Sequence, residues 1–136
     1  MNNVIASKIV SLQRCVLRAR EEHHQAGNAF ATDYTRQDAA LLNVLRACEI
    51  SIDLANHVIN QRKLGMPSST RESFELLEQA KIIDPSLENK MIRMGAFRNL
   101  CVHTYKQIDI NIVSDVIQNG LNDLLKFADI LARLPL

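Results

Sequence analysis

Residues 36–63 read RQDAALLNVLRACEISIDLANHVINQRK, a run without glycine or proline. Its apolar side chains recur at alternating steps of four and three residues, at Leu41, Leu45, Cys48, Ile52, Ala55 and Ile59. Because an α-helix has about 3.6 residues per turn, this spacing gathers them on one face. The run therefore predicts one long amphipathic helix with a buried stripe.

The same spacing occurs on both sides of this run. The flanking stripes consist of Ile5, Ile9, Leu12, Val16 and Ala19, then Leu87, Met91 and Met94, then Val113, Ile117, Leu121, Leu124, Ala128 and Leu131. No segment alternates apolar and polar residues as a half-buried strand does. We expect helices near 4–25, 36–63, 69–80, 86–102 and 109–132. The expected fold is all-α, an up-and-down bundle of about five helices in a single domain, 1–136.

Composition narrows the class of protein. The 136 residues suit one domain, and only four are glycine and three proline, so few turns are needed. Sixteen Lys and Arg residues against 15 Asp and Glu leave a net charge of +1, which indicates neither a nucleic-acid nor a membrane partner. With no Trp and 4% aromatic residues, the chain lacks the composition of an aromatic platform that stacks single-stranded nucleic acid.

Cysteine usage and the absence of long apolar runs indicate the compartment. Three cysteines without a CxxC pair fit a reducing cytoplasm and point to neither a zinc knuckle nor a redox site. The N-terminus lacks the pattern of a signal peptide, and no stretch is apolar for long enough to span a membrane. Two long apolar stripes plus two shorter ones exceed the needs of one small core, so we expect a cytoplasmic homodimer.

Arg98 interrupts the apolar pattern. It lies eleven residues after Leu87, about three helical turns, where the stripe calls for an apolar side chain. One interpretation is an ion pair with a carboxylate such as Glu49 or Asp53. The other is that Arg98 points into a polar cleft, at a subunit interface, where its guanidinium holds a phosphate.

His103 follows five residues later. In a continuous helix it points about 140° away from Arg98, so both can face one cleft only if the helix ends near residue 102 or if a second subunit supplies one of them. A histidine at a helix end commonly interacts with the helix dipole instead. Together with Tyr105, however, the pair has the groups for metal-independent phosphodiester chemistry: an imidazole that moves protons and a guanidinium that stabilises phosphate charge.

The segment 98–105, RNLCVHTY, fits the pattern RxxxxHxY and resembles the signature of HepT-type toxins in the HEPN superfamily. Chain length, helix order, the position of the motif before the last helix and the sequence of the second helix also resemble that family. The resemblance implies a metal-independent endoribonuclease without a cofactor, acting on RNA as the toxin of a toxin–antitoxin pair. It leaves the RNA substrate open.

The resemblance also implies roles for single residues. Arg98 and His103 would be the catalytic pair, assembled across a homodimer interface, and Asn99 would orient the phosphate or His103. Tyr105 would be the residue that a minimal nucleotidyltransferase antitoxin, MntA-like, modifies with AMP. Such a modification adds negative charge beside the catalytic pair, competes for the guanidinium and repels RNA.

Two other functions remain open. The chain could be a non-catalytic HEPN subunit that helps a nucleotidyltransferase bind its substrate, with Arg98 and His103 holding nucleotide phosphate. It could also be a dimerisation bundle without chemistry, although that leaves Arg98 in the apolar stripe unexplained.

Further residues have simpler interpretations. Glu49, Asp53 and His57 form a strip along the second helix that could bind a metal, but an ion-paired face is the favoured interpretation and we predict no metal site. Glu49 and Asp53 are expected to support the site. Cys48 and Cys101 fall on apolar stripes and are expected to be packed thiols. Gly95 and Gly120 predict close helix packing, with Gly95 helping to form the site next to Arg98.

Overall fold

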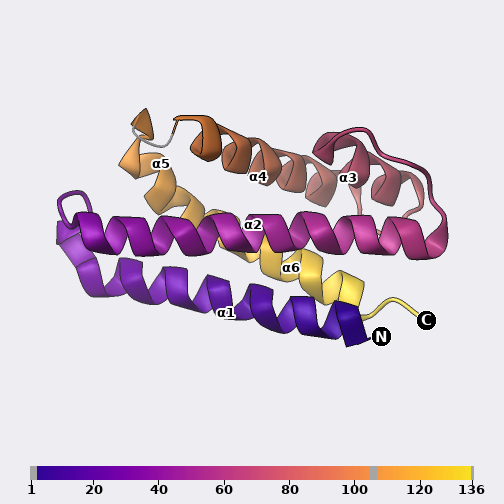
Figure 1. The fold of residues 1–136 in the computed structure, drawn as a ribbon, viewed down its shortest axis with the longest axis horizontal. Coiled ribbons are helices and arrows are strands. Elements are labelled where there is room, and N and C mark those ends of the chain that lie inside the picture. The colour runs from indigo at the N-terminus through magenta and orange to yellow at the C-terminus, as the bar shows by residue number, and fades with distance from the viewer. Residues whose placement is uncertain (1–2, 105–106, 136) are drawn as a thin grey trace.

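The computed structural model describes residues 3–104 and 107–135, and over these residues it contains helices and no strand (Figure 1). The helices are α1 (Asn3–Ala26), α2 (Tyr34–Arg62), α3 (Thr70–Gln79), α4 (Pro85–Thr104), α5 (Ile110–Asp115) and α6 (Leu121–Ala132). A short 3₁₀ turn, Gly27–Ala29, follows α1. The all-α bundle is therefore confirmed. None of the described helices combines the length and apolar character needed to cross a membrane.

The long helices run up and down beside one another (Figure 1). α1 and α2 are antiparallel neighbours, and α4 runs antiparallel to α2 on its other side. α6 packs against α1, α2 and α4. Short connections force this arrangement, because helices joined by a few residues pack as antiparallel neighbours.

Side chains at the helix ends explain where the helices begin and stop. Asp33 accepts a hydrogen bond from the Arg36 N–H at 3.1 Å and starts α2. Ser69 accepts from the Glu72 N–H at 3.1 Å and starts α3. Each side chain satisfies a backbone donor that the first helical turn leaves without a partner. Lys63 ends α2 in the left-handed region, with φ 56°.

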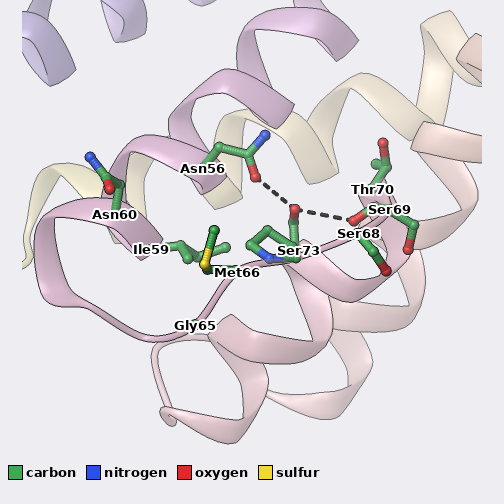
Figure 2. A pocket seen from close by; sticks show the side chains of 10 residues that line it. Asn56, Ile59, Asn60, Gly65, Met66, Ser68, Ser69, Thr70 and Ser73 are labelled. Carbon is green, nitrogen blue, oxygen red and sulfur yellow. Dashed lines mark hydrogen bonds between the residues drawn. The ribbon is translucent and has the colours of Figure 1, made fainter.

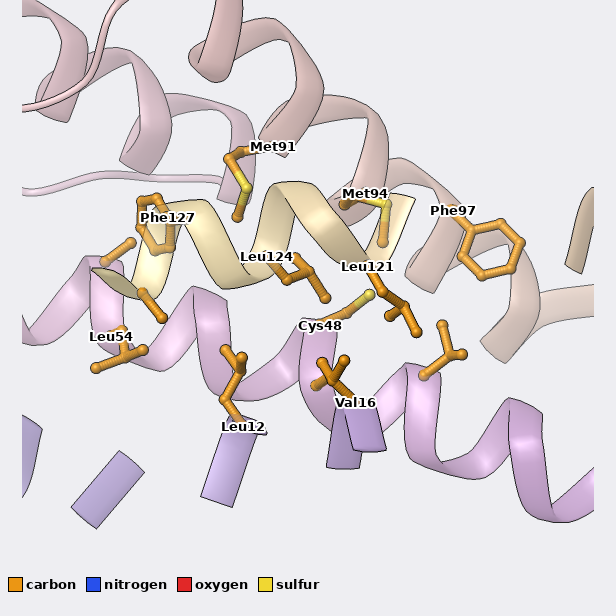
Figure 3. Close-up of a cluster of buried hydrophobic side chains, with 14 of the residues drawn as sticks. Leu12, Val16, Cys48, Leu54, Met91, Met94, Phe97, Leu121, Leu124 and Phe127 are labelled. Carbon is orange, nitrogen blue, oxygen red and sulfur yellow. The ribbon is translucent and has the colours of Figure 1, made fainter. Parts of the chain in front are cut away.

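The core lies where α2 meets α1, α4 and α6 (Figure 3). Apolar side chains from all four helices interdigitate there: Leu12, Val16, Cys48, Leu54, Met91, Met94, Leu121, Leu124 and Phe127. Burying one large aliphatic or aromatic side chain stabilises the fold by roughly 1.5–3 kcal/mol. The predicted stripes are the residues that fill this core, so the helical spacing located it correctly.

The last helix departs from the prediction of one continuous helix over 109–132. A π-helical segment, Val116–Gly120, separates α5 from α6. A Cβ on Gly120 would lie 3.1 Å from the Met94 sulfur, tighter than ordinary packing. The wider π turn and the missing side chain let α4 lie close to this segment.

Gly95 also serves close packing, as predicted. A Cβ there would lie 2.9 Å from Thr70 Cγ2, so Gly95 lets α4 approach the start of α3. A role of Gly95 in the site next to Arg98 stays a prediction.

Candidate active site

Arg98 lies on the side of α4 that meets α2. Its Nη2 and Nε donate to Oε1 of Glu49 at 2.8 and 3.3 Å, and its Nη1 donates to Oδ1 of Asn99 at 3.1 Å. The side chain is still about a third exposed. The predicted ion pair with Glu49 is therefore confirmed, and it holds the guanidinium at the surface of the bundle. The second interpretation, a phosphate held in a cleft at a subunit interface, stays a prediction.

The guanidinium keeps capacity for a further ligand. Arg has five N–H donors in a fixed plane, and these contacts use three of them. Two donors remain for a phosphate oxygen as far as the described residues show. A partly exposed ion pair contributes at most about 1 kcal/mol to stability. The chief consequence of the Glu49 and Asn99 contacts is therefore to fix the orientation of the guanidinium.

Asp53, the other carboxylate expected to pair with Arg98, lies beside Lys8 instead. Its carboxylate lies 3.8 Å from the Lys8 amine and is well exposed. Of the two carboxylates proposed as partners, Glu49 is the one that pairs with Arg98. Within residues 3–104 and 107–135 no three His, Cys, Asp or Glu side chains gather as a metal site would require, so Glu49, Asp53 and His57 do not form such a group.

Two thiols are buried close to the arginine. Burial raises the pKa of Cys48 to about 12, with Cys101 acting in the same direction and the Arg98 charge opposing it. Burial likewise raises the pKa of Cys101 to about 11. Both thiols keep their protons at neutral pH, so neither is an activated nucleophile. They are packed core residues, as predicted.

His103 lies in the last turn of α4 and is exposed. The helix continues past residue 102 to Thr104, whose hydroxyl donates to the Leu100 carbonyl at 2.7 Å. Because α4 is continuous, His103 points about 140° away from Arg98 and lies about 7.5 Å further along the axis. The condition under which one chain could face both residues into one cleft is thus not met. Tyr105 lies outside the described residues.

Apolar side chains surround the end of α4. Leu100 and Val102 are half-exposed, as is Leu42 on α2. Val102 is one turn from Arg98 on α4, and Leu42 is two turns from Glu49 on α2, so each lies on roughly the same side of its helix as one member of the ion pair. The sequence analysis did not single them out. The sequence did contain a sign of this exposed apolar surface, because Leu42 and Leu100 are apolar residues outside the buried stripes of their helices.

A cavity of about 480 Å³ lies at the other end of α2, against the start of α3 (Figure 2). Its lining contains hydroxyl and amide side chains and no charged group: Asn56, Ile59, Asn60, Gly65, Met66, Pro67, Ser68, Ser69, Thr70 and Ser73. The Ser73 hydroxyl donates to Asn56 at 2.6 Å and ties α3 to α2 (Figure 2). Without an acid, a base or a cation, this cavity offers no groups for phosphodiester chemistry.

The chain resembles known ribonucleases over most of its length. Residues 12–131 match the family described as Ribonuclease HepT-like. The mRNA nuclease HepT of Shewanella oneidensis is 39% identical over 131 residues, which are 96% of this chain and 98% of the relative.

Solved structures of similar proteins share the fold. A tri-AMPylated HEPN toxin of Shewanella oneidensis, in complex with its MNT antitoxin, is 37% identical with a TM-score of 0.92, and the match covers 98% of this chain and 100% of that one. A toxin–antitoxin complex with AMP-PNP is also 37% identical, with a TM-score of 0.90 over 96% of this chain and 99% of that one.

Proposed function

Because this chain belongs to the HepT-like ribonuclease family, we propose that it is an endoribonuclease toxin whose cleavage of RNA uses Arg98 and His103. The observation that carries the proposal is the guanidinium of Arg98, held at the surface by Glu49 and Asn99 with two donors left for phosphate. An arginine in this state binds a phosphodiester without needing to change its protonation.

Arg98 supplies the electrostatic part of the reaction. As the RNA 2′-oxygen attacks phosphorus, negative charge grows on the non-bridging phosphate oxygens. The remaining N–H donors of Arg98 can bind those oxygens more strongly as that charge grows. Because Glu49 and Asn99 fix the guanidinium beforehand, little reorganisation is needed at that moment.

His103 supplies the proton transfers. A neutral imidazole takes the proton from the 2′-hydroxyl as the bond from O2′ to phosphorus forms. A protonated imidazole gives a proton to O5′ as the bond from phosphorus to O5′ breaks. The products are a 2′,3′-cyclic phosphate and a free 5′-hydroxyl, so the proposed reaction balances without a metal or a cofactor.

A second copy of the chain completes this site. Since Arg98 and His103 of one chain point apart on a continuous α4, a two-fold dimer that joins the ends of the two α4 helices would bring both pairs together. One His103 then acts as base and the other as acid. The exposed Leu42, Leu100 and Val102 are apolar surface that such a contact would bury.

Control of the activity is assigned to Tyr105 and to a nucleotidyltransferase antitoxin. The similar HEPN toxin is AMPylated and bound to an MNT antitoxin. Tyr105 lies two residues after His103 in the matching motif, so each AMP added there would place a negative phosphate beside the catalytic pair. That charge would compete with RNA for Arg98.

The decisive experiment is RNA cleavage by the purified protein in EDTA. Wild type should cut total RNA, and His103→Ala should lower the rate about 10²–10⁴-fold, the usual contribution of an acid–base residue. His24→Ala, which removes an exposed histidine of α1, is the matched control and should cut like wild type. Intact mass must show that Tyr105 is unmodified. Undiminished cleavage by His103→Ala would refute the assignment.

A mixing experiment tests the shared site. When wild type and His103→Ala are co-expressed in equal amounts, a site that needs the His103 side chains of both chains retains about a quarter of the activity, because only wild-type pairs cleave. Independent sites retain half. Absence of cleavage by unmodified wild type would instead favour the non-catalytic subunit that binds nucleotide phosphate with the same residues.

A further inference from the structure

A cavity of about 240 Å³ lies between the start of α2 and the segment that leads into α5. Its lining residues are Tyr34, Gln37, Asp38, Leu41, Ile108, Ile110 and Val113. The four α2 residues are spaced i, i+3, i+4 and i+7, so they share one face of the helix. The volume is below the roughly 300–1,000 Å³ of drug-sized ligand sites, which suits a single planar ring system.

The walls of this cavity match the faces of a heteroaromatic ring. Leu41 and Val113 are buried, and Ile108 and Ile110 are half-buried, which gives an apolar floor. At the rim, Tyr34 is 71% exposed. An exposed aromatic beside an apolar slot is the arrangement on which nucleobases stack.

The polar groups of the rim include hydrogen-bond acceptors. Gln37 Nε2 donates one hydrogen bond to the Phe30 carbonyl at 2.6 Å, and its Oε1 keeps the capacity to accept. Asp38 adds a carboxylate, which has about four acceptor positions and so can take a ligand donor in addition to a contact within the chain. Acceptors favour bases that carry an exocyclic amino group, which adenine, cytosine and guanine have and uracil lacks.

The cavity is close to the catalytic residues along the helix axes. α4 is antiparallel to α2 (Figure 1), and Arg98 pairs with Glu49. At about 1.5 Å per residue, His103 is then level with about residue 44 of α2, and Leu41 lies about 4.5 Å beyond that level. Along the bundle axis, the cavity therefore lies at nearly the same height as His103 and the phosphate cleaved there.

We propose that this cavity binds the nucleobase next to the scissile phosphate and that Tyr34 stacks on it, with Gln37 and Asp38 selecting an amino-bearing base. The inference rests on the proposed ribonuclease function and deepens it, because it assigns a base preference to a site that otherwise contacts only phosphate and ribose. Tyr34 is a specificity-determining residue in this account.

Binding of nucleosides tests the cavity without any cleavage. In methyl NMR spectra of the isoleucine-labelled protein, adenosine and cytidine should shift the Ile108 and Ile110 signals more than uridine does, while Ile83 at the α3–α4 connection stays unchanged. Tyr34→Ala should weaken binding roughly tenfold or more, and Tyr34→Phe should retain it. Since Tyr34 is exposed, neither variant should unfold. No shift at Ile108 and Ile110 would overturn the proposal.

Mapping of cleavage ends tests the assignment to RNA. Wild type and Tyr34→Phe should prefer an amino-bearing base at one position beside the cut, and Tyr34→Ala should lose that preference and raise KM with little change in kcat. If nucleosides bind but Tyr34→Ala keeps the wild-type cleavage pattern, the cavity serves another base, such as that of an AMP on Tyr105, and the proposal is wrong. If wild type cuts nothing, the ribonuclease function fails, while the nucleoside shifts still report on the cavity.

Discussion

Two ion pairs of this protein have the same chemistry and different surroundings. Arg98 pairs with Glu49 and Arg36 pairs with Glu22, each with an N–O distance of 2.8 Å. The arginine side chains are 31% and 35% exposed, and the glutamates 50% and 28%. The geometry of the ion pair alone therefore does not distinguish the arginine proposed to be catalytic, Arg98, from Arg36.

The difference lies in what surrounds each pair. Arg36 and Glu22 join α1 and α2, which are consecutive in the chain. Arg98 joins α4 to α2, makes a third contact with Asn99, and lies beside the exposed apolar end of α4. The first pair links two consecutive helices, and the second presents a cation beside exposed apolar side chains, where we propose that a second copy binds.

The largest expected difference between the two ion pairs is in the rate of RNA cleavage after each arginine is removed. Arg98→Ala should lower RNA cleavage about 10²–10³-fold, because a donor to the developing phosphate charge is lost. Arg36→Ala should leave kcat within about twofold, since that pair is structural. The measurement is the rate of cleavage of one RNA in EDTA at matched protein concentration. Equal losses in both variants would mean that Arg98 is structural too.

The thiols beneath Arg98 provide a prediction about pH. A thiol whose pKa is higher in the folded protein than in the unfolded chain favours folding below the unfolded pKa of about 8.5, and this stabilisation is lost as the pH rises toward the folded pKa. Cys48 and Cys101, with pKa values of about 12 and about 11, should each remove roughly 1.4 kcal/mol per pH unit between about pH 9 and 11.

Urea unfolding at pH 7 to 11 checks this slope. Above pH 9, the free energy of unfolding should fall less steeply with pH for Cys48→Ala than for wild type, because one of the two titrating thiols is gone. At pH 7 the variant should already be less stable than wild type. Parallel slopes in the two proteins would show that the buried thiols do not govern alkaline unfolding.

A smaller difference in kcat is expected between variants of the two glutamates, Glu49 and Glu22. Glu49→Gln keeps the size of the side chain and one acceptor but removes the charge that orients Arg98, so kcat should fall about fivefold, the equivalent of about 1 kcal/mol. KM should not rise, because a negative charge near the RNA phosphate is gone. Glu22→Gln is the matched control and should change neither constant. A loss of Tm without a change in kcat would assign Glu49 a structural role only.

The smallest effects concern stability. Arg98→Ala and Arg36→Ala should each lower the free energy of unfolding by at most about 1 kcal/mol, or about 2–4 °C in Tm, because both pairs are partly exposed. Thermal melts of the two variants check this. A loss several times larger at Arg98 would mean that its cleavage defect reflects unfolding.

Much of the candidate site could be described from the sequence because its residues are close together in the chain or fall on regular helical positions. The position of Arg98 in an apolar stripe pointed to a paired or functional arginine, and Glu49 was named as a partner. Asp53 was named equally, and only the structure shows it beside Lys8 instead. One turn of helix separates the two carboxylates, and the rotation of α4 against α2 decides which of them meets Arg98.

The cavity at Tyr34 could not be foreseen. Its α2 side follows a helical spacing, but its other wall comes from residues about 70 positions later, around Ile108 and Val113. No local pattern links the two segments. The π segment was missed as well, because it coincides with the close approach of Met94 to Gly120, a contact between two helices that no local pattern predicts.

The sequence by itself determined the helices, the core and the motif, because helical periodicity, end-capping residues and the spacing RxxxxHxY are local properties of the chain. Only the tertiary structure decided how far α4 extends, which carboxylate holds Arg98, and that Arg98 and His103 of one chain point apart. These depend on packing between distant segments, where small rotations of whole helices select among side chains that the sequence presents as equivalent.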